Sequence, residues 1–142
     1  MLGMKKYTEA YVSACRASVK ENLLAYRKQV GKTSSKDFES RYFNCQVLLL
    51  DYMFVHRLTG IEGKDGNALN EVRILCNSIL LNNGKLQIEK LPSWPNSAGS
   101  GMKLPREKSI LKLQPGDQIQ LSESDFARLS EAFFQEIENR YT

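Results

Sequence analysis

The stretch Phe43-Asn44-Cys45-Gln46-Val47-Leu48-Leu49-Leu50-Asp51-Tyr52-Met53-Phe54-Val55-His56-Arg57 decides the fold of this chain. On a helix, its apolar residues point in nearly every direction, so we expect the rest of the protein to cover it on all sides. The pattern predicts a helix over about 36–59, capped by Ser34 or Ser35 and ended by Gly60. This helix is predicted to be the central element of the fold.

Asp51 is a lone carboxylate within this apolar run. Because burying an unpartnered charge is costly, we predict that Asp51 is a buried polar residue with a structural role, hydrogen-bonded to another helix. Arg16 and Arg73 are the first candidates, since no residue three or four positions from Asp51 is cationic. A role in binding a ligand or moving a proton is the alternative.

Three further helices are predicted from apolar spacing and capping residues. The first runs over about 9–30 behind Thr8, the next begins after Asn67 and ends before 82–84, and the last begins at Ser122. A Pro-Gly turn between two short apolar segments predicts a small β-hairpin over about 109–121. The predicted fold class is mainly α, with three to four helices packed around the central helix, and α+β is the alternative.

The composition is that of an ordinary globular protein, with 142 residues, 42% hydrophobic residues and 25% charged residues. We predict a single domain over 1–142. No apolar run is long enough for a membrane span or a secretory signal, so we expect a cytoplasmic protein without membrane contact. Cys15, Cys45 and Cys76 are odd in number and widely spaced, which predicts three reduced cysteines buried in the core.

The net charge of +4 is unevenly distributed. Residues 1–36 hold eight Lys and Arg against two acidic residues, whereas residues 115–142 hold six acidic residues against two arginines. A basic first helix could bind nucleic acid. The same asymmetry could equally draw two subunits together, or two helices of one bundle. No aromatic interleaving or recognition motif accompanies the basic residues, which disfavours nucleic acid.

Catalytic and metal-binding patterns are weak in this sequence. Cys45 and His56 share a helix face but lie roughly 16 Å apart along it, too far to share a metal ion. Asp51 and His56 diverge around the helix, and no nucleophile motif or phosphate-binding loop accompanies them. We therefore predict no metal, no cofactor and no catalytic residue. These weak patterns disfavour an enzymatic function.

The turn Gly63-Lys64-Asp65-Gly66-Asn67 is the best candidate for a ligand site. It opens a helix, and the free N–H groups at a helix N-terminus favour a small anion. The predicted ligand-binding residues are His56, Arg57, Lys64, Asn67 and Arg73. The alternative is a plain connection in which Asn67 caps the helix itself.

Several motifs resemble a family of small uncharacterised bacterial proteins of unknown function. They are Phe54-Val55-His56-Arg57, Gly63-Lys64-Asp65-Gly66-Asn67, Leu69-Asn70-Glu71-Val72-Arg73, Pro115-Gly116-Asp117 and Leu129-Ser130-Glu131-Ala132-Phe133-Phe134. The likeness covers about 40–142. It implies a bacterial cytosolic protein and assigns no residue a role.

From these features we predict a non-catalytic, cytosolic binding or protein-interaction module. A helix that is apolar on all faces is hard to cover with three partners in a chain of this size, so we expect a homodimer. One alternative is a small enzyme or small-anion binder that uses the 63–70 turn with His56, Arg57 and Arg73. The other is a nucleic-acid-associated protein that uses the basic first helix.

Overall fold

Four helices build the part of the chain that the structure, a computed structural model, describes: residues 6–30, 33, 35–54, 61–89 and 103–142. They are α1 (Glu9–Gln29), α2 (Lys36–Met53), α3 (Ala68–Leu81) and α4 (Glu123–Tyr141). Within these ranges there is no strand, and β-type pairing is limited to an isolated antiparallel bridge between Lys85 and Gln118. The prediction of a mainly helical fold is confirmed.

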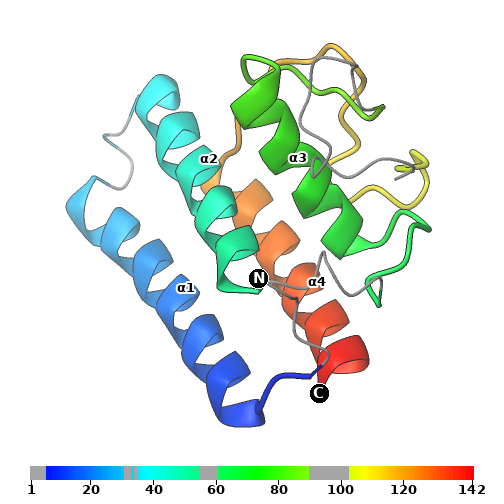
Figure 1. Cartoon of the computed structure of the whole chain (residues 1–142). Coiled ribbons are helices and arrows are strands. Elements are labelled where there is room, and N and C mark those ends of the chain that lie inside the picture. The colour runs from blue at the N-terminus through cyan, green and yellow to red at the C-terminus, as the bar shows by residue number, and fades with distance from the viewer. Residues whose placement is uncertain (1–5, 31–32, 34, 55–60, 90–102) are drawn as a thin grey trace.

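The helices pack with α2 and α4 in the middle, and each of these two contacts all three of the others. In Figure 1, α1 and α3 lie on opposite sides of the α2–α4 pair, and the loops gather beside α3. Buried hydrophobic side chains from all four helices form one core cluster. Phe43 of α2 packs on Phe126 of α4, and Phe54 packs on Phe133, with ring centroids 5.5 and 5.6 Å apart.

Each helix begins at the capping residue that its sequence predicts. The side chains of Thr8, Ser35, Asn67 and Ser122 each accept a hydrogen bond from the backbone N–H three residues later. This satisfies one of the N–H groups that every helix start leaves open. The predicted starts are therefore confirmed, and Ser35 rather than Ser34 caps α2.

The prediction of a central helix over 36–59 is wrong in two respects. Helix α2 ends at Met53, because Phe54 is extended with φ −129° and ψ 111°. Its apolar residues are also not covered on every side, since Leu49 and Tyr52 are 39% and 76% exposed. The bundle covers the face with Phe43, Val47 and Leu50, and the opposite face remains open.

Helix α3, rather than α2, is buried on all sides, over its N-terminal half. Every residue from Ala68 to Cys76 is buried, including three polar ones, Asn70, Glu71 and Arg73. Buried polar groups must find partners, and these side chains hold the neighbouring segments in place. At the far end of the helix the burial ceases, and Leu80 is 66% exposed.

The predicted β-hairpin over 109–121 is not formed, because both of its halves bind elsewhere. The carboxylate of Glu71 accepts hydrogen bonds from Ser109 Oγ (2.9 Å), Ile110 N (2.7 Å) and Leu111 N (3.1 Å). The second half pairs with the segment after α3: Leu86 N donates to Asp117 O at 2.9 Å. The two halves of the predicted hairpin therefore form no ladder of hydrogen bonds with each other.

Candidate interaction surface

The turn before α3 satisfies its own hydrogen-bonding groups. Asn67 Oδ1 accepts from Asn70 N at 3.1 Å, and Asn70 Oδ1 accepts from the backbone N–H groups of Asn67 (3.2 Å) and Gly66 (3.0 Å). Asn70 Nδ2 then donates to Gly63 O at 3.0 Å. This reciprocal capping box occupies N–H groups that the anion prediction requires to be free.

Of the four predicted cations, the structure describes Lys64 and Arg73, and neither is free to bind an anion at this turn together with the other. Arg73 is buried and its Nη2 lies 3.5 Å from Glu62 Oε1, whereas Lys64 is exposed. Asp65 adds a negative charge, and the hydrogen bond from the Asn67 amide lowers the pKa of the Asp65 carboxyl below its ordinary value. The other two predicted ligands, His56 and Arg57, lie outside the described residues.

We expect inorganic phosphate to leave this turn unchanged. The backbone amides of residues 64–71 can be followed by NMR while phosphate is added to millimolar concentration. Because Asn67 and Asn70 fill the helix start, the resonances of 64–71 should not move. Saturable shifts confined to these amides would contradict the plain turn and restore the anion site.

Asp51 is buried, with 6% of its surface exposed, as predicted. Both arginines proposed as its partners contact glutamates. Arg16 forms ion pairs with Glu131 and Glu138 of α4, and Arg73 pairs with Glu62. Neither arginine is therefore reserved for Asp51, and a hydrogen bond from another helix to this carboxylate stays a prediction.

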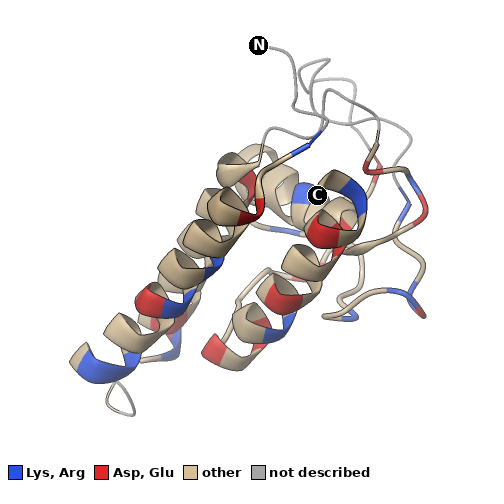
Figure 2. Ribbon diagram, turned by 90° about the horizontal axis from the view of Figure 1, so that it is seen from below, with Lys and Arg blue, Asp and Glu red and all other residues tan. Residues whose placement is uncertain are grey.

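The charge asymmetry of the sequence joins two helices of one chain. Arg16 and Arg27 of α1 pair with Glu131, Glu138 and Glu123 of α4. Figure 2 shows α1 and α4 running beside each other with charged residues along both. The uneven charge of the sequence could attract either a second subunit or another helix of the same chain. These ion pairs favour attraction between helices of one chain.

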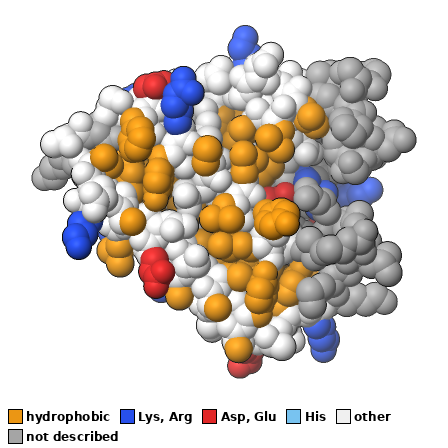
Figure 3. Space-filling view, turned by 60° about the vertical axis from the view of Figure 1, so that its left-hand side comes forward, with side chains coloured by type: hydrophobic (Ala, Val, Ile, Leu, Met, Phe, Trp, Pro, Cys, Tyr) orange, Lys and Arg blue, Asp and Glu red, His pale blue; other side chains and the backbone are white. Residues whose placement is uncertain are grey.

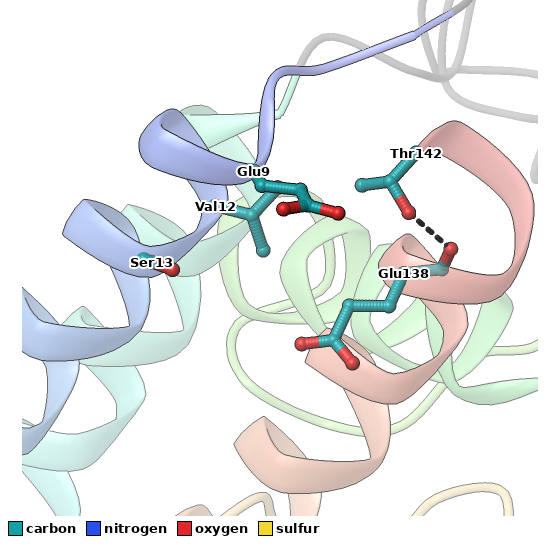
Figure 4. Close-up of a pocket in the computed structure, with 5 residues that line it drawn as sticks. All are labelled: Glu9, Val12, Ser13, Glu138 and Thr142. Atoms are coloured by element: carbon teal, nitrogen blue, oxygen red, sulfur yellow. Dashed lines mark hydrogen bonds between the residues drawn. The ribbon is translucent and has the colours of Figure 1, made fainter.

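A pocket of about 310 Å³ lies between the start of α1 and the end of α4. Glu9, Glu138 and Thr142 approach it in Figure 4, where the Thr142 hydroxyl donates to the backbone oxygen of Glu138. Glu138 is already paired with Arg16. Among the described residues, no group of three or more His, Cys, Asp or Glu is placed to hold a metal ion.

The open side of α2 exposes several large apolar side chains. Phe38, Cys45, Leu49 and Tyr52 are exposed there, with Tyr42 half-buried between them. From Tyr42 to Met53 the sole charged residue of α2 is Asp51, which is buried. We call these five residues the α2 face: Phe38, Tyr42, Cys45, Leu49 and Tyr52. Figure 3, turned toward the α1 side of Figure 1, shows hydrophobic side chains gathered with few charges among them.

The C-terminal end of the α2 face is held by α1. Tyr11, 42% exposed, donates its hydroxyl to Met53 O and packs edge-on against Phe54. Burial, with a hydrogen bond to Cys15, raises the pKa of Tyr11 to about 12, so the hydroxyl stays protonated as a donor at neutral pH. This contact fixes the last turn of α2 in place.

No protein-family model, curated protein or solved structure matches this chain. The resemblance of its motifs to a family of small bacterial proteins therefore stays a prediction. Assignment of a function rests on the surfaces and contacts of the chain itself.

The structure corrects one prediction about the cysteines. Cys15 and Cys76 are buried as predicted, but Cys45 is exposed in the middle of the α2 face. Helical periodicity places Cys45 with Leu49 and Tyr52 on one side, but it does not show whether another helix covers that side.

None of the described helices is long and apolar enough to cross a membrane.

Proposed function

We propose that this protein is a non-catalytic, cytoplasmic interaction module that self-associates through the α2 face. The observation that carries the proposal is a helix side with exposed Cys45, Leu49 and Tyr52 and no exposed charge between Tyr42 and Met53. Scattered apolar residues on a surface need no explanation, but a continuous apolar stripe marks a contact site.

Self-association would bury this apolar stripe away from water. Removing apolar surface from water stabilises a complex by about 25 cal/mol for each Å² buried. Tyr52, with 76% of its surface exposed, offers a large ring and a hydroxyl that can remain at the wet edge of an interface. Tyrosine is also among the residues enriched at the energetic centres of interfaces.

The alternatives predicted from the sequence receive less support. A nucleic-acid site on the first helix would need cations that are free to meet phosphate, but Arg16 and Arg27 are engaged by α4. A small-anion site at the turn before α3 would need N–H groups that Asn67 and Asn70 already occupy. No observation favours either of them over the α2 face.

A single charge on the α2 face is expected to weaken the self-association. Leu49→Glu would place a carboxylate in the apolar contact, twice in a symmetric dimer, so the dissociation constant should rise by about tenfold or more, equivalent to about 1.4 kcal/mol. Sedimentation equilibrium over a range of protein concentrations measures this constant directly.

Leu24→Glu is the matched control for this measurement. Leu24 is 59% exposed on α1, and the turns of that helix place it away from the buried side formed by Val12, Val19 and Tyr26. It should therefore leave the dissociation constant unchanged. A wild-type chain that sediments as a 16.2 kDa monomer at every concentration would overturn the proposal.

A further inference from the structure

We propose that the outer side of α4 binds an acidic, partly apolar segment of another protein, in a trough between α4 and the loop formed by residues 103–112. This inference goes beyond the proposed self-association, because the trough shares no residue with the α2 face. The two proposals can therefore fail independently of each other.

Two adjoining hollows form the trough. The larger, of about 770 Å³, lies between α4 and residues 109–110, and the smaller, of about 370 Å³, continues it to the turn before α3. The floor is apolar where Ile110, Ala127 and Ala132 lie half-buried. Each alanine carries a single methyl group, so a peptide backbone can approach α4 closely there. We call this surface, with Ile110, Ala127, Ala132 and Gln135, the α4 trough.

The loop side of the α4 trough is held in place by the rest of the chain. The buried carboxylate of Glu71 accepts from Ile110 N at 2.7 Å, and Arg128 Nη1 donates to Ile110 O at 3.3 Å. Ile110 is therefore fixed through both its N–H and its C=O. A surface that is already in place loses little conformational entropy when a partner binds, and such preorganisation favours binding.

The loop 103–112 supplies positive charge along the α4 trough. Among the described residues, none of its four cations forms a salt bridge with a carboxylate. Lys108 and Asp65 both line the smaller hollow, so Asp65 offsets part of this charge. Four cations against two carboxylates, Glu107 and Asp65, leave a charge of +2. The four cations, all exposed, are Lys103, Arg106, Lys108 and Lys112.

Two of these ammonium groups are positioned with donors to spare. Lys108 Nζ donates to Asp65 O at 3.1 Å. Lys112 Nζ donates to Arg106 O at 2.9 Å and to Ser109 O at 3.2 Å. An ammonium has three N–H donors, so each of the two lysines keeps at least one for a carboxylate of a partner.

The carboxylates on the α4 side of the trough are engaged within the chain. Glu131 pairs with Arg16, and Glu136 pairs with Arg140 at 2.8 Å. The cations without a carboxylate partner therefore lie on the loop side. A segment that turns its own carboxylates to the loop and its apolar side chains to the floor complements both halves of the trough.

A nucleic acid fits the α4 trough less well than such a segment. Single strands bind by stacking their bases on aromatic rings, but none of the described residues that line the two hollows is aromatic. A continuous run of phosphates would also meet Glu131 and Glu136, whereas a peptide can place uncharged side chains beside them.

A displayed library of random octapeptides tests the proposal on the full chain. The trough follows α4 from Ala127 to Glu136, about 14 Å along the helix, which an extended peptide covers with about four residues. Selection should enrich peptides that combine aspartate or glutamate with a large apolar residue such as leucine or phenylalanine. Because the contact is small, we expect a dissociation constant in the micromolar range, measured by fluorescence anisotropy of a labelled copy of the strongest peptide.

Two variants test the two halves of the trough. Lys108→Glu reverses a charge of the loop, and Ala132→Gln fills the apolar floor with a polar side chain that a helix tolerates well. Each should raise the dissociation constant of the selected peptide by about tenfold or more. Lys28→Glu is the matched control, because Lys28 is an exposed lysine of α1 that lines neither hollow. It makes the same change in net charge and should leave the constant unchanged.

Three results would overturn the proposal. The first is a selection that enriches no acidic peptides. The second is an enriched peptide that binds Lys108→Glu and Ala132→Gln as tightly as the wild type, because it would then bind elsewhere. The third is a labelled single-stranded oligonucleotide that binds more tightly than the selected peptide and is lost in Lys108→Glu, which would assign the loop 103–112 to nucleic acid. Sedimentation of the wild type tests the α2 face separately.

Discussion

Glu71→Ala is expected to lower the free energy of unfolding by at least about 3 kcal/mol, because it leaves three donors without their acceptor at about 1–3 kcal/mol each. Glu71 is 1% exposed, and its carboxylate accepts from Ser109 Oγ and from the N–H groups of Ile110 and Leu111. A loss of this size is a large part of the roughly 5–15 kcal/mol that stabilises a typical domain. Urea unfolding followed by circular dichroism measures it.

Glu71→Gln tests whether the carboxylate itself is needed. One of the two oxygens becomes an NH2 group that faces an N–H donor, so part of the hydrogen bonding is lost and an intermediate destabilisation is expected. Glu107→Ala is the control, because Glu107 is an exposed glutamate of the same segment. Equal unfolding midpoints for Glu71→Ala and Glu107→Ala would show that Glu71 does not hold the 109–111 segment.

The helices and their starts could be predicted from the sequence because the determinants are local. A capping side chain binds a backbone N–H three residues away, so Thr8, Asn67 and Ser122 mark helix starts without reference to the rest of the fold. The end of α3 is also set locally: Asn83 and Gly84 adopt positive φ values of 56° and 78° just after this helix.

The hairpin and the central helix were wrong because they depend on contacts distant in sequence. Alternating apolar residues around Pro115-Gly116 describe a hairpin equally well, but the partner of 109–111 is Glu71, about 40 residues earlier. Nothing near Glu71 marks its side chain as buried, since a glutamate on a helix is usually solvated.

Several residues of α2 and α3 are exposed or buried against their polarity. The apolar residues around α2 predicted complete burial, yet Leu49 and Tyr52 are exposed. The polar residues at the start of α3, Asn70 and Glu71 among them, are buried because each has hydrogen-bond partners. Periodicity shows which residues share a helix side, but the number and position of neighbouring helices decide which side is covered. The same limit kept the α2 face from being recognised.

The second large effect is expected at the buried pair of Glu62 and Arg73. Their side chains are 6% and 3% exposed, with Arg73 Nη2 at 3.5 Å from Glu62 Oε1, and Tyr141 Oη donates to Glu62 Oε2 at 3.2 Å. Arg73→Met removes the cation and leaves the carboxylate buried. We expect a loss of about 3–5 kcal/mol in the free energy of unfolding, the usual cost of breaking a buried ion pair from one side.

The double variant, Glu62→Gln with Arg73→Met, tests whether the loss of stability comes from the unpaired charge left on buried Glu62. The glutamine side chain introduced by Glu62→Gln carries no charge, and its carbonyl oxygen can still accept from Tyr141 Oη, so stability should recover in part relative to Arg73→Met alone. Arg128→Met is the matched control, because the Arg128 side chain is 55% exposed beside Asp125 and its ion pair should contribute less than about 1 kcal/mol. If the double variant were no more stable than Arg73→Met, the cost would lie in the lost packing of Arg73 rather than in the charge left on Glu62. Recovery in the double variant would instead show that α3 tolerates a buried arginine because Glu62 lies opposite it, between α3 and the end of α4.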